Sequence, residues 1–142
     1  MKIDLRGVRK FYVISFALVF VLSAASYKLY FSDLEPLVNG YDNFIDWFVV
    51  IMASVFFGIN WGILENTLKE VKQKEFNKRI KYYAKLLFSN QLIMLFMYMI
   101  VFVIYILTFD LTAITMVFLY NILFVSVFYP GEKRTAKKLG VS

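Results

Sequence analysis

The sequence predicts an all-α membrane protein whose chain crosses the bilayer four times as a single domain of residues 1–142. Four apolar runs carry this prediction, at about residues 11–31, 44–64, 86–107 and 111–129. Each run is long enough to form a helix across a hydrocarbon core about 30 Å thick. Apolar residues make up 61% of the chain and aromatic residues 20%, which leaves too little polar surface to cover such a core in water.

The positions of the positive charges predict the direction of each crossing. Fifteen of the sixteen lysines and arginines lie in three clusters, at residues 2–10, 69–85 and 133–138. The connections between the first two runs and between the last two contain no lysine or arginine. Because basic loops stay on the cytoplasmic side during insertion, we expect two antiparallel hairpins with both termini and the basic loop 65–85 in the cytoplasm. The expected location is a bacterial inner membrane.

Local signals at the ends of the runs support these helices. Asp110 is placed to cap the helix of the fourth run, and Pro130–Gly131 is placed to end it. Within loop 65–85, the helices of the second and third runs are expected to extend and to meet near residues 74–77, because apolar residues continue at helical spacing.

Tyrosine and tryptophan favour the boundary between membrane and water, because the ring is apolar while its polar atom can still reach water. We place Tyr12, Trp61, Tyr82, Tyr83 and Tyr129 at the inner boundary and Tyr27, Tyr30, Tyr41, Trp47 and Tyr105 at the outer one.

The absence of cysteine and histidine from the sequence excludes several kinds of chemistry. Disulfides, histidine-ligated haem, the usual zinc sites and a Ser–His–Asp triad all need one of these residues. We therefore expect no metal, no cofactor and no enzymatic activity. A membrane enzyme would have to act through Asp46, Glu65 or a serine, and these lie at different depths.

The net charge of +6 predicts contact with anionic lipid and no nucleic-acid binding. The cations border the apolar runs and do not form a face with interleaved polar groups, as a nucleic-acid site would require.

Neutral polar residues at one depth form a candidate polar layer on the cytoplasmic side, to which all four helices contribute. Its members are Ser15, Asn60, Ser89, Asn90, Gln91, Asn121 and Ser126. At a rise of 1.5 Å per residue, they are expected about 5–8 Å below the inner surface, with Asn121 the deepest. Two interpretations stay open. The groups could hydrogen-bond one another across helix interfaces, or they could line a wet vestibule open to the cytoplasm that takes a polar ligand or a segment of a partner.

Lys28 and Asp46 lie at matching depths near the outer boundary. They could form an ion pair across the first hairpin, or each side chain could reach the headgroups independently.

Ser54, Gly58 and Gly62 follow one another at four-residue spacing in the second run and so share one face of its helix. Small residues let another helix approach closely, which makes this a candidate helix-packing face. It could accept the first helix at residues 23–26, a second copy of the chain or another membrane protein.

These observations predict a small non-enzymatic membrane protein. We expect it to act by helix–helix packing as an accessory, regulatory or immunity-type partner of another membrane protein, or by self-association. The alternative is a subunit of a small oligomeric transporter, channel or lipid-linked substrate translocator that uses the polar layer as part of its path. Both classes come from size and topology. The shallow depth of Asp46 disfavours proton-coupled export, which needs a carboxylate deep in the membrane.

Overall fold

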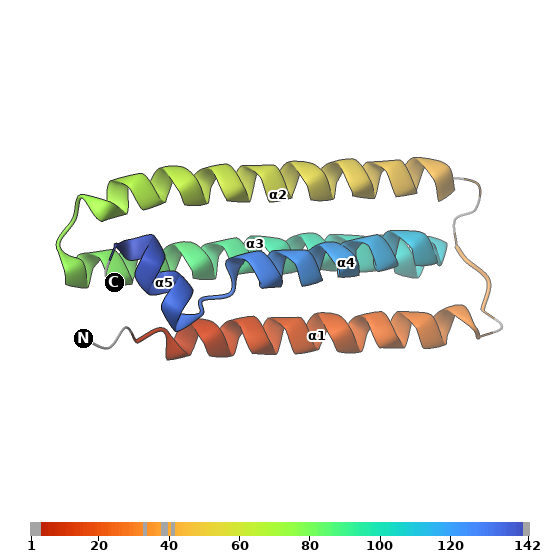
Figure 1. The fold of residues 1–142 in the computed structure, drawn as a ribbon. Coiled ribbons are helices and arrows are strands. Elements are labelled where there is room, and N and C mark those ends of the chain that lie inside the picture. Colours follow the sequence, from red (N-terminus) through yellow and green to blue (C-terminus); the bar gives the residue numbers. More distant parts are fainter. Residues whose placement is uncertain (1–3, 33, 38–39, 41, 141–142) are drawn as a thin grey trace.

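The computed structural model describes residues 4–32, 34–37, 40 and 42–140, and within them it contains five α-helices and no strand. The helices are α1 (Arg6–Tyr30), α2 (Asp42–Lys72), α3 (Phe76–Thr108), α4 (Leu111–Phe128) and α5 (Glu132–Leu139). The first four are long and apolar enough to cross a membrane, as the sequence predicts. They run up and down in turn, so that α1 begins and α5 ends at the same end of the bundle (Figure 1).

The helices extend beyond the apolar runs at the end where α1 begins. α2 continues to Lys72 and α3 begins at Phe76, so most of the expected loop 65–85 is helical. The two helices meet within residues 73–75, close to the expected position. We did not predict α5, because residues 133–138 stood out from the sequence only as a cluster of positive charges.

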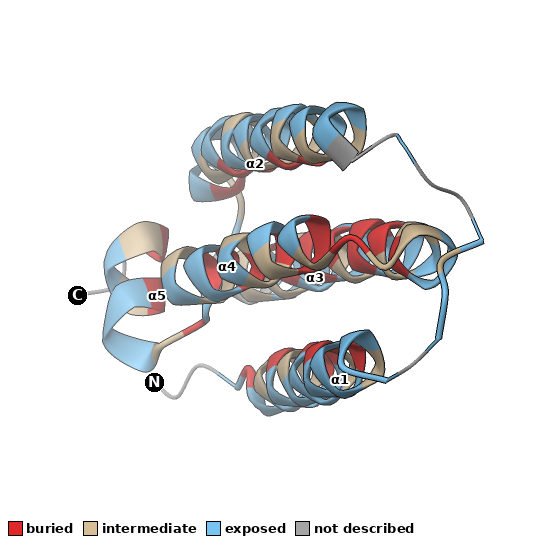
Figure 2. Cartoon of the chain, turned by 90° about the vertical axis from the view of Figure 1, so that its right-hand side faces the viewer, coloured by how far each residue is buried: buried red, intermediate tan, exposed pale blue. Residues whose placement is uncertain are grey.

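The α3–α4 pair forms the centre of the bundle. α1 and α2 each pack against both α3 and α4 but lie on opposite sides of them, and share no substantial interface in the described part of the chain (Figures 1 and 2). The expected first hairpin is therefore a connection without packing. The physical reason is the length of the connections: the two-residue turn after Thr108 forces α3 and α4 together, whereas the longer connection after α1 can cross the end of the bundle.

The turn between α3 and α4 is built by Phe109 and Asp110. Phe109 ends α3 in the left-handed conformation, with φ of 52°, and its N–H donates to the Tyr105 carbonyl at 2.7 Å. Asp110 Oδ1 then accepts hydrogen bonds from the N–H groups of Thr112 at 3.0 Å and Ala113 at 3.2 Å. This confirms the predicted N-cap of α4, which satisfies two amides that have no partner within the helix.

The core consists of two apolar clusters arranged along the bundle. We name them after the nearer end of the bundle: the basic end is the end where α1 begins, and the acidic end is the opposite one. The basic-end cluster contains Leu5, Tyr12, Leu64, Val71, Tyr83, Leu87, Met94, Phe124, Phe128 and Leu139. The acidic-end cluster contains Val19, Val49, Ala53, Met97, Tyr98, Val101, Tyr105, Ala113, Ile114 and Val117. Figure 2 shows the buried residues on the faces that the helices turn toward one another.

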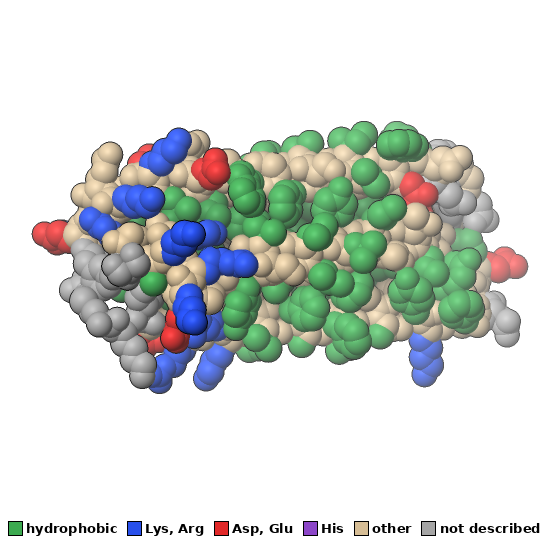
Figure 3. Space-filling model, viewed as in Figure 1, with side chains coloured by type: hydrophobic (Ala, Val, Ile, Leu, Met, Phe, Trp, Pro, Cys, Tyr) green, Lys and Arg blue, Asp and Glu red, His purple; other side chains and the backbone are tan. Residues whose placement is uncertain are grey.

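The outer surface of the bundle is apolar between its two ends. Figure 3 shows hydrophobic side chains spread along the helices and most lysines and arginines gathered at the basic end. Large side chains such as Phe96, which is 65% exposed, lie on this belt. An exposed apolar surface of this extent is typical of a protein covered by lipid.

Three tyrosines assigned from the sequence to the membrane boundary are buried between the helices. Tyr12, Tyr83 and Tyr105 are at most 2% exposed. Their hydroxyls do not reach water as the prediction assumed, because a tyrosine hydroxyl can find a hydrogen-bond partner on a neighbouring helix as well as in water.

The short helix α5 lies across the basic end and packs against α2. Its Leu139 is buried in the basic-end cluster. Arg9 of α1 holds the start of α5, since its Nε donates to the Pro130 carbonyl at 2.9 Å and its Nη1 donates to Glu132 Oε1 at 3.1 Å. Burial and, to a lesser degree, the nearby charge of Arg134 lower the pKa of Lys138.

Replacing Asp110 by alanine should destabilise the protein by about 1 kcal/mol, because two amides at the start of α4 lose their acceptor. Thermal unfolding in a mild detergent, followed by circular dichroism, measures this change. Asp110→Asn is the matched control and should keep most of the stability, because asparagine also accepts these hydrogen bonds. Equal losses in both variants would contradict a capping role.

Candidate functional site

Five members of the predicted polar layer are buried inside the bundle. Ser15, Asn60, Asn90, Gln91 and Asn121 are each at most 1% exposed, and we call these five the buried polar layer. The two remaining predicted members lie elsewhere on their helices. Ser89 is half-buried, and Ser126 is exposed with its hydroxyl donating to the Ile122 carbonyl at 2.8 Å.

The buried polar layer lies near the boundary between the two apolar clusters. On α1, α2 and α4 it lies between residues of the basic-end cluster and residues of the acidic-end cluster, whereas on α3 it lies between Leu87 and Met94 of the basic-end cluster. The order along the chain is Tyr12–Ser15–Val19 on α1, Ala53–Asn60–Leu64 on α2, Leu87–Asn90–Gln91–Met94–Met97 on α3 and Val117–Asn121–Phe124 on α4. The layer is thus enclosed along the bundle axis from both ends.

This enclosure bears on the two interpretations of the layer. Buried side chains of Tyr12, Leu64 and Leu87 lie between it and the basic end. In this structure the layer is therefore an internal polar plane and does not form a vestibule open at that end.

Three hydrogen bonds hold part of the layer. Gln91 Nε2 donates to Ser15 Oγ at 2.6 Å and so joins α3 to α1. Ser15 Oγ in turn donates to the Tyr12 carbonyl at 3.1 Å. Asn60 Nδ2 donates to the Phe56 carbonyl of its own helix at 2.8 Å.

Other polar atoms of the layer have no hydrogen-bond partner among the groups that the structure describes. They are Asn60 Oδ1, Asn90 Nδ2, Gln91 Oε1, and both Nδ2 and Oδ1 of Asn121. A buried polar group without a partner costs several kcal/mol in a hydrocarbon environment. A set of such groups at one level is therefore the most unusual feature of the interior.

The interface between α1 and α3 carries further hydrogen bonds that we did not predict. Tyr12 OH donates to the Leu87 carbonyl at 3.2 Å, and Tyr105 OH donates to the Ser26 carbonyl. Between these, Ser23 Oγ and Tyr98 OH lie 2.6 Å apart. Gln91, Tyr98 and Tyr105 follow one another at seven-residue spacing on α3, and this repeat of polar residues in an apolar run is the signal that could have identified the interface.

The expected Lys28–Asp46 ion pair is not formed. Among the described residues, ion pairs join Arg6 to Asp4, Arg9 to Glu132 and Lys78 to Glu75. Lys28 is exposed on α1. The pair was predicted for helices in contact, whereas α1 and α2 lie on opposite sides of the α3–α4 pair.

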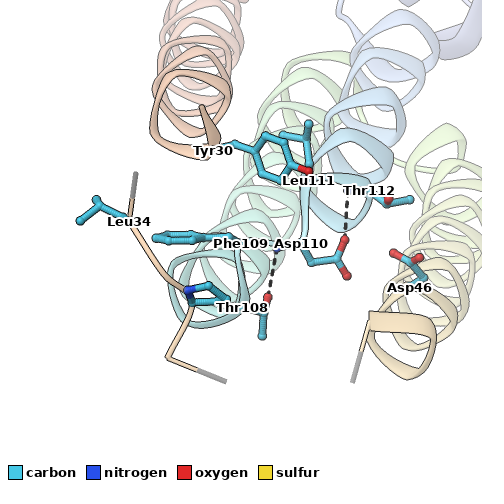
Figure 4. Close-up of a pocket in the computed structure, with 9 residues that line it drawn as sticks. Tyr30, Leu34, Asp46, Thr108, Phe109, Asp110, Leu111 and Thr112 are labelled. Atoms are coloured by element: carbon cyan, nitrogen blue, oxygen red, sulfur yellow. Dashed lines mark hydrogen bonds between the residues drawn. The ribbon is translucent and has the colours of Figure 1, made fainter. Parts of the chain in front are cut away.

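Asp46 lies instead at a cavity of about 500 Å³ at the end opposite to the basic end. The cavity is lined by Tyr30, Leu34, Pro36, Asp46, Thr108, Phe109, Asp110, Leu111 and Thr112. Figure 4 shows the carboxylates of Asp46 and Asp110 on its wall, contributed by α2 and by the α3–α4 turn. The cavity is therefore acidic, although one Asp110 oxygen is engaged in capping α4.

The two glycines of the predicted packing face of α2 point away from the rest of the described chain, whereas Ser54 reaches α4, because its Oγ lies 2.8 Å from Tyr120 OH. A Cβ built at Gly58 or Gly62 would meet no atom within 4 Å, and Gly58 and Ser54 are exposed. At 100° per residue, Gly58 lies on the side of α2 opposite to the buried Ala53 and Asn60. The interpretation that this face packs against residues 23–26 of α1 was therefore wrong.

The Ser23–Tyr98 contact should stabilise the bundle by about 0.6 kcal/mol, and at most about 1.7 kcal/mol, as measured for hydrogen bonds between membrane helices. A double-mutant cycle of Ser23→Ala and Tyr98→Phe, measured by unfolding in detergent, gives this coupling free energy.

The control is a cycle of Ser54→Ala and Tyr98→Phe, whose effects should add, because Ser54 bonds to Tyr120 and not to Tyr98. Additive effects in the first cycle would contradict the contact.

Comparison of the chain with protein-family models, with curated proteins and with solved structures finds no match. Its function must therefore be inferred from its own residues. Two features are not needed merely to span a membrane: the buried polar layer and the open face of α2.

Proposed function

We propose that this chain is a small integral membrane protein that acts without catalysis, by packing the face formed by Ser54, Gly58 and Gly62 against another membrane protein as an accessory, regulatory or immunity-type partner. The observation that carries the proposal is the position of Gly58 and Gly62 on this face, which the described part of the chain leaves uncovered. Glycines at four-residue spacing allow two helix backbones to approach closely, and this is a common basis of association within membranes.

The cost of these glycines supports the proposal. A glycine inside a helix is about 0.8–1.0 kcal/mol less favourable than alanine. Among the residues that the structure describes, no neighbouring group approaches Gly58 or Gly62 closely enough to need a glycine there. A partner helix supplies a reason for both residues.

We propose a bacterial inner membrane as the location, with both termini in the cytoplasm. The charges support this orientation, because basic loops stay in the cytoplasm. The start of α1, the connection between α2 and α3, and helix α5 all lie at the basic end (Figures 1 and 3). Anionic lipid headgroups are the proposed counterpart of the basic side chains at this end.

Enlarging the open face should abolish partner binding without destabilising the chain. The double variant Gly58→Leu, Gly62→Leu adds side chains into open space and replaces two poor helix formers, so its thermal stability should be unchanged or higher. The measurement is the size of the complex that the protein forms in its native membrane, by native electrophoresis in mild detergent and by reciprocal purification through the identified partner.

Ala17→Leu is the matched control, because Ala17 is a small exposed residue of α1. The complex should persist in this variant and disappear in the glycine variant. A single-chain monomer in the native membrane, or the same complex in all three proteins, would overturn the proposal.

A second candidate function rests on the unpartnered amides of the buried polar layer. In this proposal the chain is a subunit of an oligomeric transporter, channel or lipid-linked substrate translocator. The layer would be one part of a polar path, and an oligomer is needed because apolar clusters close the layer on both sides within one chain.

The second candidate predicts that Asn121→Leu strongly reduces flux of an ion or lipid across liposomes that contain the protein, because Asn121 has two unpartnered polar atoms in the layer. Ser126→Ala is the control, since Ser126 is exposed outside the layer, and it should leave the flux unchanged. No flux by the wild-type protein, for ions and lipids of either charge, would eliminate this candidate.

A further inference from the structure

We infer that the buried polar layer is a binding site for internal water molecules, held by the amides of Asn60, Asn90, Gln91 and Asn121 between buried apolar residues on both sides along the bundle axis. This inference concerns the interior of the single chain and is independent of which partner or substrate the protein has.

The unpartnered atoms of the layer include both donors and acceptors. Asn90 and Asn121 each present an Nδ2 group that could donate, and Asn60, Gln91 and Asn121 each present an oxygen that could accept. Water can donate two hydrogen bonds and accept two, so it can join such a mixed set. Buried waters in proteins typically make about three hydrogen bonds to polar groups of this kind.

Direct pairing of the amides does not account for them in this structure. The Nδ2 of Asn60 and the Nε2 of Gln91 already donate to Phe56 and Ser15. Exchanging the oxygen and nitrogen of the Asn121 amide does not provide a hydrogen bond for either atom, because both lack a partner among the described groups. Bridging by water satisfies atoms that are too far apart to bond directly, at little loss in enthalpy.

The surroundings of the layer favour water over other occupants. Its five residues are neutral, so the layer supplies no charge for an ion. Buried apolar residues enclose it along the axis, so a larger ligand has no open route from either end of the bundle. Each unsatisfied polar group would cost several kcal/mol in a dry interior, whereas the entropy cost of holding one water is at most about 2 kcal/mol.

Radiolytic hydroxyl labelling of the full chain in lipid nanodiscs tests this inference, because the short-lived radicals modify buried side chains only where water lies beside them. Two matched pairs of reporters are available. Met94 and Phe124 lie three residues from Gln91 and Asn121, whereas Met97 and Phe128 lie six and seven residues away. All four are at most 4% exposed, so solvent at the protein surface does not distinguish them.

The expected result is severalfold stronger labelling of Met94 than of Met97, and of Phe124 than of Phe128. In Asn121→Leu this difference should shrink toward none, because leucine has a similar size but cannot bind water. Equal labelling within both pairs of the wild-type protein would overturn the inference, and so would a difference that persists in Asn121→Leu. The comparison within the wild-type protein decides the matter even if the variant fails to fold.

Discussion

A hydrocarbon environment offers no hydrogen-bond partners, and this constraint explains most of the polar contacts of the bundle. Helices satisfy the backbone internally, but every side-chain hydroxyl or amide in the membrane needs a neighbour. The Ser26 hydroxyl donates a hydrogen bond to the Leu22 carbonyl, four residues earlier on α1. The hydroxyls of Tyr98 and Tyr105 cross from α3 to α1. Five amide atoms of the buried polar layer are the exception among the described groups, and the second candidate function and the inference of bound water rest on them.

The same constraint separates what the sequence could predict from what it could not. Four crossings follow from the length of the apolar runs, and the cap of α4 follows from one aspartate at a fixed position, so both are local properties. Contacts between helices that are far apart in the sequence are not local properties, so the sequence alone did not reveal them. The prediction paired α1 with α2 because they are consecutive, whereas α1 contacts α3 through groups such as Ser23 and Tyr98.

The polar layer shows the same division. Its depth follows from a rise of 1.5 Å per residue, which is the same for every helix. Whether a residue at that depth faces the interior or the lipid depends on which neighbours pack against its side of the helix. Five of the seven predicted residues face the interior, while Ser126 is exposed even though it lies only five residues from Asn121. Ser126 satisfies its hydroxyl within its own helix, so exposure to lipid has no cost for it.

Both features that distinguish this chain meet on one turn of α2. Asn60 lies between Gly58 and Gly62 in sequence and faces the interior, while the glycines face outward. A partner helix that packs against Gly58 and Gly62 would therefore contact the same turn of α2 that places Asn60 in the layer. Amides bridged by water tolerate small displacements better than direct hydrogen bonds, because water molecules can reorient as the distances change. A hydrated layer would thus let α2 shift against α3 and α4 without leaving polar groups unsatisfied, which links the open face to the interior.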